Sequence, residues 1–155
     1  MEKIKSFQVD HTKFGVGMYI SRIDGDIVTY DLRMVKPNGG VYLETPSMHT
    51  IEHLLATYVR NSKFAENVVY AGPMGCRTGF YLLLRGIEHK DAIDLVKASL
   101  KFISEYNDEI PGVSIEECGN YLEHNLENAK KDVVPLMKKL EDYNVEMLKY
   151  NSNND

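Results

Sequence analysis

The sequence has few cysteines and no long apolar run. Only two of its 155 residues are cysteines, Cys76 and Cys118, which excludes the dense disulfide framework of a small secreted domain. No stretch approaches the roughly 18 to 20 apolar residues of a membrane span, and the N-terminus lacks the apolar region of a secretory signal. These absences predict a cytoplasmic protein with two free thiols, each available as a ligand or a catalytic group.

Positive charge is also scarce. The chain has 18 lysines and arginines against 23 acidic residues, a formal net charge of −5. The absence of a basic block argues against nucleic acid or an anionic membrane as partner, whereas a small-molecule substrate remains compatible. Hydrophobic residues make up 43% of the chain, enough for a single packed domain. We expect this domain to span residues 1–150, followed by a polar tail at 151–155.

Hydrophobic periodicity predicts an irregular succession of strands and helices. Asp24-Gly25 is a turn signal, and the alternation after it places Arg33 on the strand face away from the apolar side chains. The predicted elements are a hairpin within 21–35, a helix over 46–61, a strand–turn–strand unit over 67–86, and helices over 89–106, 119–131 and 134–150. Short connections between them favour one α+β domain, an antiparallel sheet with helices packed on one side.

The stretch "MHTIEHLLA" places two histidines and a glutamate on the first predicted helix. His49 and His53 are four residues apart and therefore lie on one face, where two imidazoles can bind the same divalent metal. Glu52 lies beside them, in the His-x-x-Glu-His order of inverted zincins. A solvated polar helix face is the alternative, but this spacing of three such residues favours a metal site.

A catalytic metal site needs a third protein ligand and an open position. Cys118 is one candidate, since a thiolate suits Zn or Fe(II). Cys76 is another, and the adjacent Arg77 favours its thiolate. His124 and His89 rank lower as ligands, because neither has a partner at ligand spacing.

An inverted-zincin peptidase is one function that these residues leave open. Its third ligand would be a carboxylate, for which Glu116, Glu117 or Glu123 are the candidates. The chain is short for such a peptidase. A metal-binding module without catalytic activity is the other open alternative.

Five segments occur in an order and spacing that is highly specific when they are taken together. They are "SFQVDHTK", "YDLRMVKPN", "HTIEHLLATYVR", "GPMGCRTGFYLLLRG" and "ECGNYLEHNLENAK". Together they closely resemble S-ribosylhomocysteine lyase, the bacterial enzyme family that makes the autoinducer-2 precursor. The resemblance covers residues 6–131, nearly the whole predicted domain. It therefore adds a third function, a carbon–sulfur lyase, to the two alternatives above.

The resemblance implies an α+β homodimer with active sites at the subunit interface, and Fe(II) as the metal, one per subunit, with Zn or Co(II) as substitutes. The site residues it implies are the metal ligands His49, His53 and Cys118, the catalytic pair Cys76 and Glu52, and the substrate-binding residues Ser6, His11 and Arg33. The implied reaction moves a sugar carbonyl along the ribose and then eliminates homocysteine. A thiol and a carboxylate beside a cation suit such proton transfers.

The sequence departs from the family pattern at two places. Residues 14–20 replace a segment that usually contains Ala-Pro-Tyr. An aspartate and a serine usually precede the catalytic cysteine by six and four residues, and here those positions are Tyr70 and Gly72. We expect these changes to affect substrate binding but not the metal ligands. Whether the product serves as a signal or the enzyme mainly recycles homocysteine is left open by the sequence.

Overall fold

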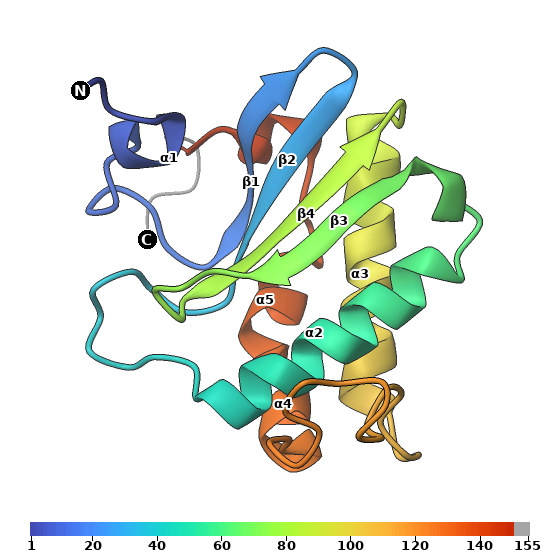
Figure 1. The fold of residues 1–155 in the computed structure, drawn as a ribbon. Helices are drawn as coiled ribbons and strands as arrows, with labels where there is room; N and C mark the ends of the chain where they lie inside the picture. The colour runs from blue at the N-terminus through green and yellow to red at the C-terminus, as the bar shows by residue number, and fades with distance from the viewer. Residues whose placement is uncertain (151–155) are drawn as a thin grey trace.

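The computed structural model describes residues 1–150, so the predicted tail at 151–155 lies outside the described residues. One antiparallel sheet forms the centre, with strand order β1-β2-β4-β3. The long helices α2 and α3 pack together on one side of this sheet (Figure 1). The predicted α+β class, with an antiparallel sheet and helices on one side, is therefore confirmed.

The predicted strands and the first two predicted helices are present, although the first strand of the hairpin begins at Gly17 rather than within 21–35. The hairpin consists of β1 (Gly17–Asp24) and β2 (Ile27–Arg33), and Gly25 adopts a positive φ of 63° in its turn. The elements that follow are α2 (Thr45–Arg60), the 3-10 turn η1 (Ala65–Asn67), β3 (Val68–Pro73), β4 (Gly79–Arg85) and α3 (His89–Glu105). Helix α2 begins one residue earlier than expected, so Glu44 rather than Thr45 is its N-cap.

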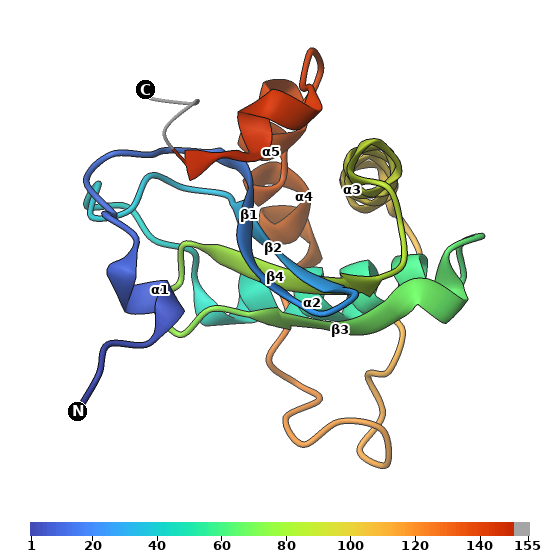
Figure 2. The same ribbon diagram turned by 90° about the horizontal axis from the view of Figure 1, so that it is seen from above.

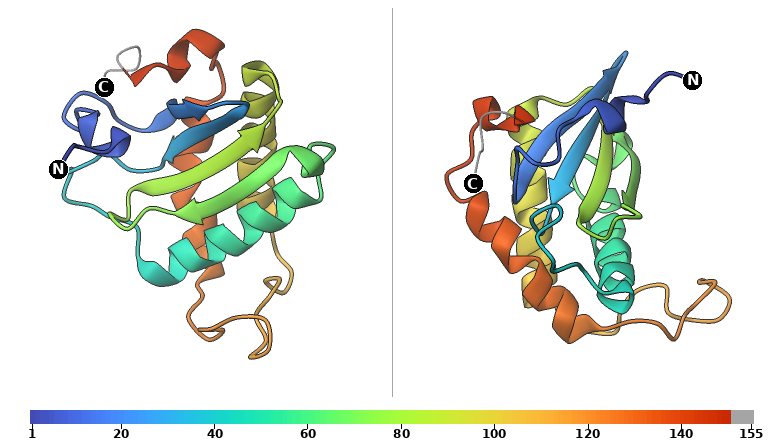
Figure 3. Two further views of the ribbon diagram at one scale, coloured as in Figure 1. Left: turned by 45° about the horizontal axis from the view of Figure 1, so that its top comes forward. Right: turned by 90° about the vertical axis from the view of Figure 1, so that its left-hand side faces the viewer.

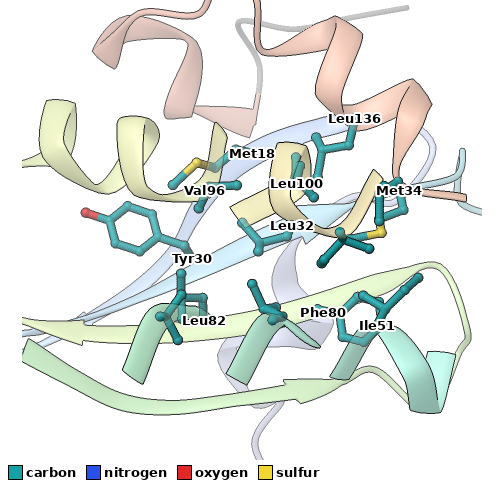
Figure 4. Close-up of a cluster of buried hydrophobic side chains, with 14 of the residues drawn as sticks. Met18, Tyr30, Leu32, Met34, Ile51, Phe80, Leu82, Val96, Leu100 and Leu136 are labelled. Carbon is teal, nitrogen blue, oxygen red and sulfur yellow. The ribbon is translucent and has the colours of Figure 1, made fainter. Parts of the chain in front are cut away.

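Alternation along the strands sorts apolar and polar side chains onto opposite faces of the sheet. Leu32 pairs with Phe80 and Tyr30 pairs with Leu82 across β2 and β4, and all four side chains are fully buried. They meet α2 and α3 in the main core (Figure 4). Burial of this apolar face supplies the main driving force for folding.

The two C-terminal helices are shorter than predicted. Helix α4 (Leu126–Asp132) begins at Leu126 rather than 119, because the side chain of Asn125 caps it by accepting from the N–H of Asn128. Helix α5 (Val134–Lys139) ends well before residue 150 and is followed by the 3-10 turn η2 (Val145–Leu148). Residues 106–125 are consequently a long irregular segment, which projects beyond the layers below α2 (Figures 1 and 3).

The face of the sheet opposite α3 carries polar and aromatic side chains. Tyr19, Asp31 and Tyr81 are neighbours across β1, β2 and β4. The short helix α1 (Lys5–Gln8) lies on this side (Figures 2 and 3). We call this face of the sheet, on which Tyr19, Asp31 and Tyr81 lie, the outer face.

In the described part of the chain, no helix has the length and apolarity needed to cross a bilayer.

Candidate functional site

The two histidines of α2 meet a cysteine from the irregular segment 106–125. Cys118 Sγ lies 3.3 Å from His49 Nε2 and 3.9 Å from His53 Nε2. A tight turn presents the thiol, since the N–H groups of Glu117 and Cys118 both donate to the carbonyl of Ser114. The structure therefore brings Cys118 to two histidines that precede it by 69 and 65 positions along the chain, and the three residues are those implied as metal ligands.

Both histidines are held in the tautomer that a metal requires. His49 Nδ1 lies 2.9 Å from the carbonyl oxygen of Glu123, and His53 Nδ1 lies 2.7 Å from that of Pro111. A carbonyl oxygen only accepts hydrogen bonds, so each Nδ1 carries the proton and each Nε2 presents a lone pair. Such outer partners fix ring orientation and raise ligand basicity. The irregular segment supplies both carbonyls.

His124 is a fourth donor in the same cluster, although it ranks below the two cysteines as a ligand on sequence alone. The hydroxyl of Thr50 donates to the carbonyl of Pro46, and its oxygen accepts from the N–H of Asn125 and from His124 Nδ1. His124 Nε2 therefore has a lone pair, and it is buried without a hydrogen-bond partner. Burial, with the neighbouring His49, lowers the pKa of His124 to about 4, so the ring is neutral at pH 7.

The four donor atoms fit a divalent transition metal. One atom each from His49, His53, Cys118 and His124 lies within 4.8 Å of all the others. Three imidazole lone pairs and one thiol are the borderline-soft donors that suit Fe(II), Zn or Co(II). A buried polar atom without a hydrogen-bond partner, such as His124 Nε2, is explained if it binds an ion. By contrast, His89 lies outside this cluster, and its Nδ1 bonds to the hydroxyl of Tyr30 at 2.6 Å.

Gly112→Ala is expected to weaken metal binding by about 10- to 100-fold, the usual effect of disturbing an outer partner. Gly112 has a positive φ of 74°, and a Cβ there would lie 3.2 Å from His53 Nδ1, the atom that donates to Pro111. Titration of the metal-free protein with Co(II) would measure the effect. Gly119→Ala is the matched control in the same segment, since a Cβ there meets nothing within 4 Å. Equal affinities in the two variants would contradict the role of the Pro111 carbonyl.

Cys76 lies in a second group of predicted residues, on the outer face. It is in the β3–β4 connection and shares a cavity of about 410 Å³ with Arg33, Ser6 and His11. Phe7, Tyr81 and the Pro73–Gly75 turn complete the lining. The structure thus collects all three residues predicted to bind substrate around the predicted catalytic thiol.

Arg33 is not a solvated strand residue, because a buried carboxylate holds it. Only 2% of its surface is exposed, and Asp31 is fully buried beside it. Arg33 Nε and Nη2 donate to the two oxygens of Asp31 at 3.0 and 2.5 Å. Burial opposes the charge of Arg33, but Asp31 outweighs it and raises the pKa of the guanidinium. Sequence reasoning missed Asp31, although its position two residues before Arg33 on the same strand was a signal.

The His/Cys cluster and the cavity that contains Cys76 are separate within one chain. Among the described residues, none of the four cluster residues lines the cavity that contains Cys76. Glu52 is half-buried on α2, in the same turn as His53, and it is likewise not part of the cavity lining. The single chain therefore presents the cluster of three histidines and Cys118 in one place and the Cys76 thiol with Arg33 in another.

Tyr70 and Gly72, which depart from the family pattern, fit each other because the Tyr70 ring occupies the space that a side chain at position 72 would need. Both lie on the outer face of β3, and a Cβ at position 72 would collide with the Tyr70 ring. Tyr70 lines a neighbouring cavity of about 250 Å³ that also contains Ser6 and Tyr81. The pair therefore reshapes the rim next to the Cys76 cavity and leaves the metal cluster unchanged.

Comparison with known proteins gives one consistent result. Residues 4–147 match the family described as S-Ribosylhomocysteinase (LuxS). Curated relatives named S-ribosylhomocysteine lyase include one from Borreliella afzelii, 46% identical over 97% of this chain and 99% of the relative. Others come from Clostridium beijerinckii, at 50% identity over 84% of this chain and 86% of the relative, and from Porphyromonas gingivalis, at 44% over 92% and 93%.

Proposed function

Because the chain belongs to the S-ribosylhomocysteinase (LuxS) family, we propose that it is a metal-dependent lyase that cleaves S-ribosyl-L-homocysteine. The products are L-homocysteine and 4,5-dihydroxy-2,3-pentanedione, the autoinducer-2 precursor. The observation that carries this proposal is the convergence of His49, His53 and Cys118 on one point, with both imidazoles in the metal-binding tautomer. An inverted-zincin peptidase would not need a family-matched thiol in a second cavity.

The reaction needs a base that removes a proton from a carbon atom and returns it to the neighbouring carbon. Carbonyl migration from C1 to C2 and then to C3 requires removal of a proton next to a carbonyl, through an enediolate, and its return to the neighbouring carbon. We assign this transfer to Cys76, whose sulfur lies in the cavity beside Arg33. In the last step a proton leaves C4 and homocysteine leaves C5 as its thiolate, which completes the β-elimination.

Glu52 is the second acid and base in this proposal. Its carboxylate shuttles protons on the sugar hydroxyls while Cys76 acts on the carbons, so that the two groups divide the work. Ser6, His11 and Arg33 hold the substrate in the cavity, and Arg33 offers planar donors to a carboxylate or to sugar oxygens. His49, His53 and Cys118 would hold the metal, which supplies a Lewis acid for the negative charge that develops on the sugar oxygens.

We propose Fe(II) as the metal, one ion per subunit, with Zn or Co(II) as substitutes, since the donor set suits all three. We place the enzyme in the cytoplasm, where reducing conditions keep both cysteines free, as they are in the structure. Residues 1–150 would form the whole catalytic domain. Nucleic acid and membranes have no part in this proposal.

We further propose a homodimer in which Cys76 of one subunit acts beside the metal cluster of the other. The separation of the Cys76 cavity from the cluster within one chain supports this arrangement. The outer face, which carries the cavity, also exposes apolar side chains, among them Phe7 at 69% and Ile4 at 57% exposure. Such a two-fold interface would repeat the same site twice.

Thiol release tests the reaction directly. Protein loaded anaerobically with Co(II) is given S-ribosylhomocysteine and followed with a thiol reagent. The protein's two cysteines can contribute only a stoichiometric signal, so many turnovers must come from homocysteine. Protein that binds metal but releases no thiol would contradict the proposal. It would then be either a metal-binding module without activity or an enzyme whose substrate preference Tyr70 and Gly72 have changed.

Mixing two inactive variants tests the shared site. Cys76→Ala and Cys118→Ala each disable one group of residues, yet a heterodimer of the two retains one intact site if the groups come from different subunits. Activity should return to about a quarter of the wild-type rate when subunits exchange freely. Sites contained within single subunits would give no activity in the mixture. Sedimentation of the wild-type protein as a monomer only would also exclude the arrangement.

A further inference from the structure

A chain of hydrogen-bonded side chains crosses the outer face and ends at Cys76, with Asp31 as an acceptor on both of its sides. Its centre is the buried pair of Asp31 and Arg33, in which the guanidinium donates and the carboxylate accepts. Arg33 Nη1 then donates to Thr78 Oγ1 at 2.7 Å and lies 3.9 Å from Cys76 Sγ. A guanidinium has no acceptor, so the direction of each of these bonds is unambiguous.

Thr78 is the link between Arg33 and the thiol. Its side chain is 2% exposed, and its oxygen already accepts from Arg33. The hydroxyl proton is then free for Cys76 Sγ, which lies 3.1 Å away. A thiolate has no proton to donate, so Thr78 is the donor whenever Cys76 is deprotonated, and hydrogen bonds to charged groups are the stronger ones.

The hydrogen-bonded side chains begin, at the end away from Cys76, with Tyr150, the last residue that the structure describes. Its hydroxyl donates to Asp31 Oδ2 at 2.8 Å, and its ring stacks on that of Tyr19 with centroids 4.9 Å apart. Burial, followed by the charge of Asp31, raises the pKa of Tyr150, so the hydroxyl keeps its proton and remains a donor. The C-terminal segment reaches this point from the core, where Leu148 is fully buried.

We propose that Thr78 is a positioning residue that holds Cys76 as the acceptor of its hydroxyl proton, within a chain that runs from Tyr150 through Asp31 and Arg33. The other polar and titratable residues that line the cavity of Cys76 are the N-terminal Ser6 and His11 and Tyr81 from β4. Arg33 is the cation in direct reach, and Thr78 fixes the sulfur next to it. These hydrogen bonds thereby hold the sulfur beside Arg33 before substrate arrives.

The inference builds on the proposed function, in which Cys76 is the base, but its test does not use turnover. In the holoenzyme, bound Zn protects Cys118 from alkylation, so that iodoacetamide reacts with Cys76. The rate of alkylation is measured across a range of pH, and mass spectrometry identifies the modified cysteine. We expect Thr78→Val to slow alkylation at pH 7 by about tenfold and to move the pH profile upward, the effect of losing a hydrogen bond to a charged group. Thr78→Ser should restore the wild-type profile.

Tyr150→Phe is the second probe, since it keeps the ring on Tyr19 and removes only the hydroxyl. We expect a smaller shift in the same direction. Wild-type alkylation profiles in both Thr78→Val and Tyr150→Phe would overturn the proposal, as would a shifted profile in Thr78→Ser. A shift in Thr78→Val alone would overturn the contribution of Tyr150. If the wild-type enzyme releases no homocysteine while the profiles shift as expected, the function fails and the hydrogen-bond chain stands.

Discussion

Cys76→Ala is expected to lower the rate of thiol release by about 10²- to 10⁴-fold, the usual contribution of a proton-transfer group. Cys76 supplies the thiol in the cavity that it shares with Arg33, Ser6 and His11, so the variant removes the group proposed to take the proton from carbon. Because Cys76 lies outside the metal cluster, the variant should still bind one metal ion per subunit with wild-type affinity. Steady-state thiol release and metal titration on the same preparation would measure both quantities.

Glu52→Gln is the informative companion to this variant. A lyase that divides proton transfers between a thiol and a carboxylate loses turnover in both variants. An inverted-zincin peptidase would lose activity in Glu52→Gln and keep it in Cys76→Ala, because its chemistry uses the glutamate alone. Undiminished thiol release in Cys76→Ala would therefore remove Cys76 from the mechanism.

Cys118→Ala is expected to weaken metal binding by more than the roughly 100-fold that loss of an outer partner typically costs. Its sulfur contacts both His49 Nε2 and His53 Nε2, so its removal opens one side of the cluster. Turnover should fall with the metal content. The variant should also lose the stabilisation that metal gives the wild-type protein, since metal binding adds to the free energy of unfolding.

The two cysteines serve as controls for each other. Cys76→Ala should lose turnover and keep metal, whereas Cys118→Ala should lose both. Thermal unfolding with and without Co(II) separates the cases, because the metal-dependent rise in the midpoint should persist only in Cys76→Ala. Tight Co(II) binding by Cys118→Ala would show that His124 can replace the thiol, and Cys118 would then not be essential to the site.

The sequence predicted those parts of the fold that depend on local pattern. Residues 46–61 and 89–106 repeat apolar side chains at helical spacing and form α2 and α3 as expected. The alternation after Asp24-Gly25 placed Arg33 on the face away from the core. The spacing of His49 and His53 likewise follows from one helix, so their shared face was visible without any tertiary information.

The remaining features depend on contacts between distant segments. Helix 119–131 was predicted too long because the cap at Asn125 and the bonds of His124 to α2 hold the preceding residues in an irregular path. The same packing puts His124 into the cluster, which its isolated position in the sequence could not indicate. Asp31, which pairs with the buried Arg33, also accepts a hydrogen bond from the C-terminal Tyr150, and no periodicity connects these distant positions.

Segment 106–125 has little regular structure, yet it contributes Cys118, His124 and two backbone carbonyls to the cluster. An ion bound there would fasten the segment to α2, and its loss to oxidation or chelation would leave only a few hydrogen bonds. Local opening of the segment then costs less free energy than it does with the ion bound. Proteases cleave such openings first, so we expect metal-depleted protein to be degraded preferentially and the cellular half-life of the protein to follow the supply of the bound metal.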